Sequence, residues 1–277
     1  MSAPGPVPEE VTGGWDPRVR VFRAGDEVDV AAVVGARHVV LVDTMSAPEE
    51  AEAVLDLLAD DVAGRSLVVV NTHQHYDHTW GNAAFDPGGR HPAPIVAHTL
   101  GAEIARSPEA AAELARRQAE GPRFARVRIV APTVTVDGGA VIDAGGLTVE
   151  LVPTPGHTRD HLAAWIPEIR TLLAGDAAEH PFPYAERPED LPELVASLDR
   201  LAALDPAVVI PCHGGTSDPG LLLRNLDYFA ALRPGVSYEA ALRPLGLRPG
   251  DVPALYEDFH RMNVAAAAVR YGSHEHQ

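Results

Sequence analysis

Short apolar runs alternate with turn residues and with longer amphipathic segments along most of the chain. The runs are rich in valine and are bounded by glycine, proline or polar residues, a pattern typical of buried strands. In the first half they cover residues 19–22, 28–34, 38–42, 67–70 and 95–97. In the second half they cover residues 133–136, 147–152, 162–166, 171–174 and 208–210. The runs at 162–166 and 171–174 are close enough in sequence to form a hairpin.

The amphipathic segments predict five helices. They cover residues 48–58, 100–119, 191–204, 219–232 and 257–269, with an interruption of the second at Pro108. In the first helix, Pro48 suits the first turn, and Glu49 and Glu50 suit the positive end of the helix dipole. Two strand-rich halves, each flanked by helices, predict an α+β fold of four layers with two mixed sheets face to face.

The polar run that follows the strand at 67–70 has the sequence Asn71-Thr-His-Gln-His-Tyr-Asp-His78. Residues two apart on extended backbone point the same way, so His73 and His75 can share a partner. Asp77 and His78 lie beyond the strand end, where the chain can turn towards the same point. Neutral imidazole and carboxylate groups are preferred ligands of zinc and iron, so the run predicts a metal site. The alternative for this run alone is a solvated polar loop.

Three later segments end in the same kinds of side chain. Apolar strands lead to His157 after a Pro-Gly turn, to Asp176, and to His213 before two glycines. Each residue taken singly is an ordinary polar group at a strand end. Together with the first cluster, they predict one site assembled from four segments.

The ligand order His73-x-His75-x-Asp77-His78, His157, Asp176, His213 resembles the metallo-β-lactamase superfamily of αβ/βα sandwich metallohydrolases. The resemblance extends from the strand before Asp43 to the helix after Gly220. It implies two metal ions, the first held by His73, His75 and His157 and the second by Asp77, His78 and His213. It also implies that Asp176 bridges the two ions and that Asp43 supports the site from behind.

This ligand set suits two zinc ions about 3.5–4 Å apart, which lower the pKa of a bound water to about 7. The resemblance implies that a metal-bridging hydroxide attacks an ester-like carbonyl, with Asp77 as the catalytic residue that orients the hydroxide. Iron or manganese at one or both positions is the alternative to zinc.

The residue type at position 176 distinguishes between members of the superfamily. The best-known zinc β-lactamases place cysteine at that step, so the pattern resembles glyoxalase II, lactonases and related thioester or ester hydrolases more closely. We therefore expect a binuclear zinc hydrolase acting on a thioester or lactone. The alternatives are a mononuclear iron enzyme similar to persulfide dioxygenases, a β-lactam hydrolase, and a binding protein without turnover.

Five residues near the predicted ligands are candidates for substrate binding: Tyr76, Trp80, Arg159, His161 and Tyr184. Tyr76 and Trp80 are equally explained by packing, and Arg159 by an exposed loop. For His161 the interpretation that we favour is a hydrogen bond to the backbone. Tyr184 closes a ring-rich segment, 180–184, that is predicted to cover the site.

Length and charge set the remaining expectations. We expect a flexible, proline-rich tail at residues 1–17 and a single domain at 18–277, with a short helical extension at about 234–277. The net charge of −17 opposes binding to nucleic acid and to anionic membrane surfaces. No run is long enough to span a membrane, and no signal peptide is evident, so we expect a cytoplasmic protein with a small-molecule substrate. The single cysteine, Cys212, excludes an internal disulfide, and nothing indicates the oligomeric state.

Overall fold

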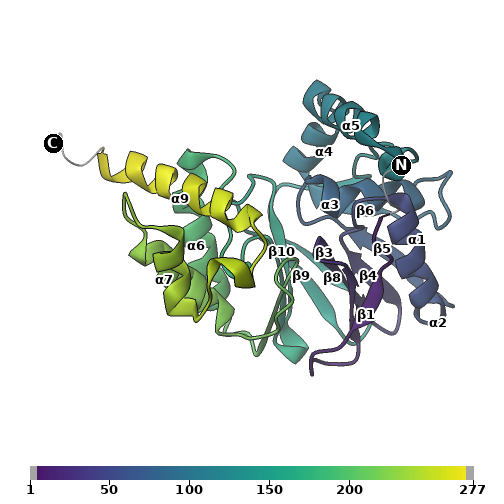
Figure 1. The fold of residues 1–277 in the computed structure, drawn as a ribbon. Coiled ribbons are helices and arrows are strands. Elements are labelled where there is room, and N and C mark those ends of the chain that lie inside the picture. Colours follow the sequence, from purple (N-terminus) through teal and green to yellow (C-terminus); the bar gives the residue numbers. More distant parts are fainter. Residues whose placement is uncertain (1–4, 273–277) are drawn as a thin grey trace.

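Two β-sheets lie face to face between two groups of helices in the computed structural model, which describes residues 5–272 (Figure 1). The first sheet has seven strands in the order β1 to β7. They are β1 (Glu9–Val11), β2 (Val19–Ala24), β3 (Val28–Val34), β4 (His38–Val42), β5 (Ser66–Val70), β6 (Ile95–His98) and β7 (Val134–Val136). The second sheet has the order β12-β11-β10-β9-β8. Its strands are β8 (Ala140–Asp143), β9 (Thr148–Pro153), β10 (Leu162–Ile166), β11 (Thr171–Gly175) and β12 (Val208–Pro211).

Both sheets are mixed. Strands β1 to β4 pair antiparallel and β4 to β7 pair parallel. In the second sheet β10 and β11 form the predicted antiparallel hairpin, and β12 adds parallel to β11. The parallel arrangement brings the carboxyl ends of β4 and β5 to one edge of the first sheet, and those of β11 and β12 to one edge of the second.

Helices cover the outer face of each sheet (Figure 1). On the side of the first sheet they are α1 (Pro48–Leu57), α2 (Ala59–Val62), α3 (Tyr76–Thr79), α4 (Thr99–Ala105) and α5 (Pro108–Glu120). On the side of the second sheet they are α6 (Leu191–Ala202), α7 (Leu221–Ala231), α8 (Tyr238–Leu242) and α9 (Leu255–Gly272). The interruption expected at Pro108 is present, because Ser107 caps α5 by accepting a hydrogen bond from the Ala110 amide.

The hydrophobic core has three layers, and strand β4 shows how they arise. Val39 and Leu41 pack under α1, whereas Val40 and Val42 face the second sheet. A third cluster lies between the second sheet and the helices α6 to α9. Because strands of the first sheet are covered on both faces, they are apolar almost throughout rather than alternating. The predicted four-layer α+β sandwich is confirmed.

Two segments differ from the sequence-based predictions. Residues 1–4 of the predicted tail lie outside the described residues, but Glu9–Val11 form β1 and pair with β2, so this part of the tail is structured. Residues 140–143, between the predicted strands at 133–136 and 147–152, form the additional strand β8. Within the expected helical extension, the stretch at 233–253 contains α8 and two short 3-10 turns.

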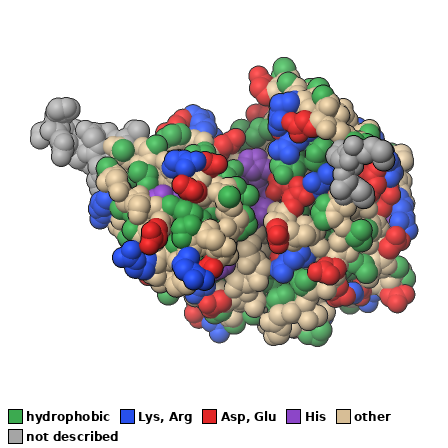
Figure 2. Space-filling model, viewed as in Figure 1, with side chains coloured by type: hydrophobic (Ala, Val, Ile, Leu, Met, Phe, Trp, Pro, Cys, Tyr) green, Lys and Arg blue, Asp and Glu red, His purple; other side chains and the backbone are tan. Residues whose placement is uncertain are grey.

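The molecule is hollowed between its two halves. Figure 2 shows histidine side chains at the bottom of this hollow, with acidic side chains beside them. Within residues 5–272, every helix is too short or too polar to cross a bilayer.

Candidate metal centre

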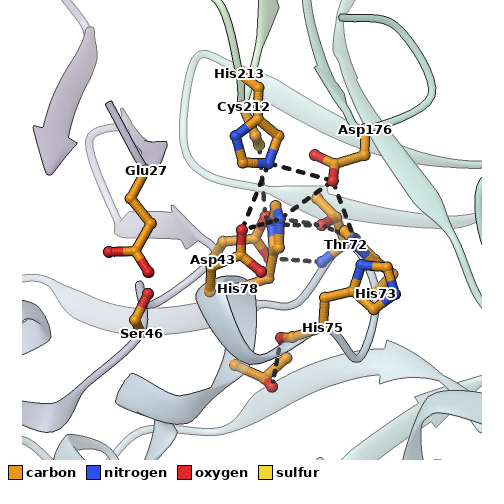
Figure 3. Close-up of polar contacts among 12 residues, drawn as sticks. Glu27, Asp43, Ser46, Thr72, His73, His75, His78, Asp176, Cys212 and His213 are labelled. Carbon is orange, nitrogen blue, oxygen red and sulfur yellow. Dashed lines mark hydrogen bonds and ion pairs between the residues drawn. The ribbon is translucent and has the colours of Figure 1, made fainter. Parts of the chain in front are cut away.

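The predicted ligands lie where the strands of both sheets end. His73 and His75 follow β5, and Asp77 and His78 lie in the short helix α3, which begins directly after His75. Asp176 follows β11 and His213 lies two residues after β12. The structure therefore brings all four segments singled out in the sequence to one place. Figure 3 shows three of them, through His73, Asp176 and His213.

His157 reaches the same place because its turn packs closely on α6. Gly156 has a φ of 139°, and a Cβ atom there would lie 2.2 Å from the backbone of Leu194. Only glycine allows this approach and this backbone conformation without strain.

Asp176 lies at the middle of the cluster. Its Oδ2 atom is 3.6 Å from Nε2 of His73, 3.4 Å from Nε2 of His78 and of His157, and 3.3 Å from Nε2 of His213. One carboxylate oxygen thus faces four imidazole nitrogens. A carboxylate between two sets of imidazoles is the arrangement by which a single side chain can bridge two metal ions.

The ligand atoms fall into two groups. Those of His73, His75, His157 and Asp176 all lie within 4.8 Å of one another, and so do those of Asp77, His78 and His213. In the second group, Oδ2 of Asp77 is 3.6 Å from Nε2 of His78 and 3.5 Å from Nε2 of His213. Apart from Asp176, which falls in the first group, the members of the two groups are those that the family resemblance assigned to the two ions.

The buried atoms at the centre have the properties expected of metal ligands. Nε2 of His73, Nε2 of His78 and Oδ1 of Asp176 are buried and have no hydrogen-bond partner. Unsatisfied polar atoms are rare in protein interiors, and several facing one point indicate a missing partner. Nitrogen and oxygen donors in this number fit zinc or a similar divalent ion.

Burial and neighbouring charges shift the pKa values of these groups in opposite directions. Burial and the surrounding imidazoles lower the pKa of His73 well below its usual value. Burial also lowers the pKa of His213, but the nearby carboxylates of Asp176, Glu179 and Asp77 together outweigh it and raise the pKa to about 10. His213 therefore holds a proton in the metal-free protein, and a divalent cation would replace that proton.

Hydrogen bonds behind the ligands fix the orientation of their rings. Asp43, which follows β4 at a φ of 66°, accepts hydrogen bonds from Nδ1 of His78 at 2.8 Å and from the backbone amide of Thr72 at 2.8 Å. The Thr72 hydroxyl donates to Asp43 at 2.7 Å and lies 3.0 Å from Nδ1 of His73. Nδ1 of His157 donates to the carbonyl of Tyr184 at 2.9 Å. In each ring the network assigns the proton to Nδ1 and leaves Nε2 available for a metal.

Two of the residues predicted to bind substrate are engaged elsewhere. His161 is buried, its Nε2 accepts the backbone amide of Asp176 at 3.0 Å, and its Nδ1 lies 2.7 Å from the Thr154 hydroxyl. It therefore positions Asp176 and has no nitrogen left for a substrate, as the favoured interpretation of the sequence held. Arg159 pairs with Asp190 at 3.3 Å and is not among the described residues that line the cavity. Arg159 is therefore a charged residue on a surface loop, the alternative that the sequence also allowed.

A cavity of about 760 Å³ opens above the ligands. Tyr76, Trp80 and Tyr184, the other three predicted substrate-binding residues, line it, although the ring of Trp80 is largely buried against Phe124. Glu179, Tyr256 and Phe259 also line the cavity and were not predicted from the sequence. Glu179 follows Asp176 by three residues, which was a usable signal, whereas the other two come from the distant helix α9.

Comparison with known proteins agrees with this geometry. A family model described as the metallo-beta-lactamase superfamily matches residues 24–213. The chain is 31% identical over 169 residues to a hydroxyacylglutathione hydrolase of Synechococcus sp. (strain JA-3-3Ab), covering 60% of this chain and 55% of the relative. It is 30% identical over 169 residues to the acyl-coenzyme A thioesterase MBLAC2 of Homo sapiens, covering 57% and 60%. The matched part thus spans little more than half the length of these relatives.

Solved structures share the fold at low sequence identity. A metallo-beta-lactamase family protein from Thermus thermophilus superposes with a TM-score of 0.63 at 23% identity, covering 96% of this chain and 93% of that one. A metallo-beta-lactamase from Pontibacter korlensis gives 0.61 at 23% identity, covering 79% and 97%. The match of the family model over most of the chain, on the fold and ligand arrangement described above, shows that the chain belongs to the metallo-beta-lactamase superfamily.

Proposed function

We propose that this protein is a metal-dependent hydrolase that cleaves an ester-like carbonyl of a small molecule at a binuclear zinc centre, with thioesters as the first substrate class and lactones as the second. The observation that carries the proposal is the position of Asp176. Its Oδ2 atom lies within 3.3–3.6 Å of Nε2 of His73, His78, His157 and His213. Four imidazoles around one buried carboxylate have no evident structural role, whereas a pair of metal ions would use all of these groups as ligands.

The roles of the side chains follow from their positions. His73, His75 and His157 would hold one ion, Asp77, His78 and His213 the other, and Asp176 would bridge them. Bound divalent ions supply a water of lowered pKa and polarise the carbonyl.

Asp77 lies on the cavity side of the second group, where its carboxylate can accept a hydrogen bond from the attacking water and orient it. The rings of Tyr76 and Tyr184 line the cavity beside these groups.

The relatives support a hydrolase and a thioester. The two named above are a hydroxyacylglutathione hydrolase and an acyl-coenzyme A thioesterase. Aspartate at position 176 and the matched ligand order favour grouping this chain with them rather than with β-lactamases.

The test combines metal analysis with a substrate panel. We expect two zinc ions per chain in protein purified without added metal, and hydrolysis of small thioesters and lactones. Asp77→Asn should reduce kcat/KM by about 100-fold or more, the usual scale for an acid–base group, while Asp56→Asn, at an exposed pair with Arg90, should leave it unchanged.

A single iron ion per chain with no hydrolysis would instead favour an oxygenase. Metal binding without turnover of any member of the panel would favour a binding protein.

A further inference from the structure

The wall of the cavity above the metal centre is strongly acidic. Seven carboxylates besides the metal ligands line it: Asp26, Glu27, Asp29, Glu109, Glu113, Glu179 and Glu186. Only two arginines, Arg23 and Arg117, lie among the described lining residues. A concave surface lined by one sign of charge concentrates ligands of the opposite sign and repels those of the same sign.

Neither arginine is available to a substrate anion. Arg23 binds Asp29 through two hydrogen bonds of 2.8 and 2.7 Å. Arg117 binds Glu113 at 2.7 Å, and its guanidinium lies 3.6 Å from the centre of the Tyr76 ring. Each guanidinium is therefore already engaged by a neighbouring carboxylate.

Several of the acids, by contrast, have no arginine paired with them. Asp26, Glu109 and Glu186 are exposed at the cavity. Within residues 5–272 none of these three carboxylates has an ion-pair or hydrogen-bond partner. The opening of the cavity therefore has more acidic than basic groups even after the ion pairs are subtracted.

Deeper in the cavity, Glu179 presents an unpaired oxygen. The side chain is 1% exposed, its Oε2 accepts the hydroxyl of Tyr256 at 2.8 Å, and Oε1 has no partner. Asn225 holds the backbone of Glu179 on both sides, with hydrogen bonds of 3.1 Å to its amide and 2.9 Å to its carbonyl. Burial and the Asp176 charge raise the pKa of Glu179 to about 8, and a cation bound beside it would lower that pKa again. A rigidly held, buried carboxyl oxygen without a partner indicates a missing donor.

Three aromatic side chains line the same cavity as Glu179: Tyr184, Tyr256 and Phe259. Tyr184 and Phe259 stack with ring centres 4.0 Å apart, and Tyr256 meets Phe259 edge to face at 5.4 Å. Aromatic faces together with a carboxylate form the usual recognition site of an ammonium group, through cation–π attraction and a charge-assisted hydrogen bond.

We propose that the cavity selects substrates that carry a protonated amine near the scissile carbonyl, and that Glu179 is the specificity-determining residue that accepts the hydrogen bond of this amine. The inference rests on the proposed hydrolase function and narrows its substrate class. It separates this chain from the two relatives named above, because glutathione and coenzyme A both carry net negative charge at neutral pH. Their thioesters should be poor substrates here.

The test uses the zinc-loaded full-length protein and three acetyl thioesters of similar size. Their thiols are 2-(dimethylamino)ethanethiol, which is cationic, 3-methylbutanethiol, which is neutral, and 3-mercaptopropanoate, which is anionic. Each kcat/KM is divided by the rate of hydroxide-catalysed hydrolysis, so that thiol reactivity cancels. We expect the normalised kcat/KM to be highest for the cationic thioester, lower for the neutral one and lowest for the anionic one. The cationic-to-neutral ratio should be at least about tenfold, the scale of a hydrogen bond to a charged group. This ratio should decrease as the salt concentration rises.

Two sets of variants test which residues cause the preference for a cationic substrate. Glu179→Gln should bring the cationic-to-neutral ratio close to one, whereas Glu168→Gln, at an exposed glutamate bonded to Thr148, should not change it. The double variant Asp26→Asn/Glu186→Gln, at exposed positions that tolerate substitution, should raise the rate for the anionic thioester.

Equal normalised rates for all three thioesters, or an equal loss for cationic and neutral substrates in Glu179→Gln, would overturn the inference and leave the hydrolase function standing. Calorimetric titration with N,N-dimethylbutylamine, and with butyrate for comparison, measures binding of a cation separately from hydrolysis. It therefore distinguishes failure of the cation site from failure of the hydrolase function. Binding of the amine alone, without turnover of any thioester, would support the cation site and contradict the hydrolase.

Discussion

Oδ2 of Asp43 lies 2.8 Å from Nδ1 of His78, and the other nitrogen of that ring, Nε2, lies 3.4 Å from Oδ2 of Asp176. One histidine therefore connects a carboxylate at the end of β4 with the carboxylate at the middle of the candidate metal centre. Asp43 also accepts hydrogen bonds from the amide and the hydroxyl of Thr72. It thereby fixes both the ring of His78 and the segment that carries the first two histidines.

Replacement of Asp43 by asparagine tests this support. Asparagine has the same shape and tolerates the positive φ of 66° at this position, so the fold should persist. It holds the His78 ring less firmly, and we expect affinity for zinc to fall by about 10- to 100-fold. Competition titration with a chromophoric chelator measures the change, with Asp56→Asn as the control. An unchanged affinity would show that His78 is oriented without Asp43.

His161 and Arg159 should behave in opposite ways, because one is buried under the centre and the other is on the surface. His161→Ala leaves the Asp176 amide without an acceptor and should lower the free energy of unfolding by about 1–3 kcal/mol, with a further loss from the cavity. Arg159→Ala removes only a half-exposed ion pair and should cost less than about 1 kcal/mol with KM unchanged. Urea unfolding and steady-state kinetics measure both. A raised KM in Arg159→Ala alone would restore it as a substrate contact.

Zinc binding should release protons, because His213 must become neutral to act as a ligand. Its pKa in the metal-free fold is raised from 6.5 to about 10. The protonated ring therefore stabilises the metal-free fold fully below pH 6.5, and this stabilisation is lost as the pH rises through about 10. Zinc affinity should accordingly increase with pH across the same interval. Calorimetry in buffers of different ionisation enthalpy counts the protons, and His213→Ala should release fewer.

Deletion of residues 1–12 tests the strand that the sequence did not predict. The deletion removes β1, the partner of β2, and with it the ion pair between Glu10 and Arg20. We expect the free energy of unfolding to fall by about 1–2 kcal/mol, the scale of a few net hydrogen bonds. Deletion of residues 1–7, which keeps β1, is the matched control. Equal stability of the two truncated proteins would mean that the segment is a tail, as first expected.

The sequence contained most of the information on the candidate metal centre. Zinc-type ligands are few in kind, and each of the candidates His73, His157, Asp176 and His213 follows an apolar run at a strand end. Strands covered on both faces, such as β4, are continuous apolar runs and are recognisable for the same reason. The short strands β1 and β8 lacked that signal, because they lie at sheet edges and their side chains are mostly exposed or half-buried.

Only the tertiary structure decided which side chains line the cavity above the ligands. Glu179, on the loop after β11, and Tyr256, in α9, are 77 residues apart and meet at 2.8 Å because α9 packs against the helices of the second sheet. Arg159 and His161 lie near the centre in sequence, yet one points to the surface and the other lies beneath Asp176. Ligand chemistry can be recognised from residue type and order, because a metal accepts few donors. The surface of a cavity depends on packing between distant elements, and local sequence does not encode it.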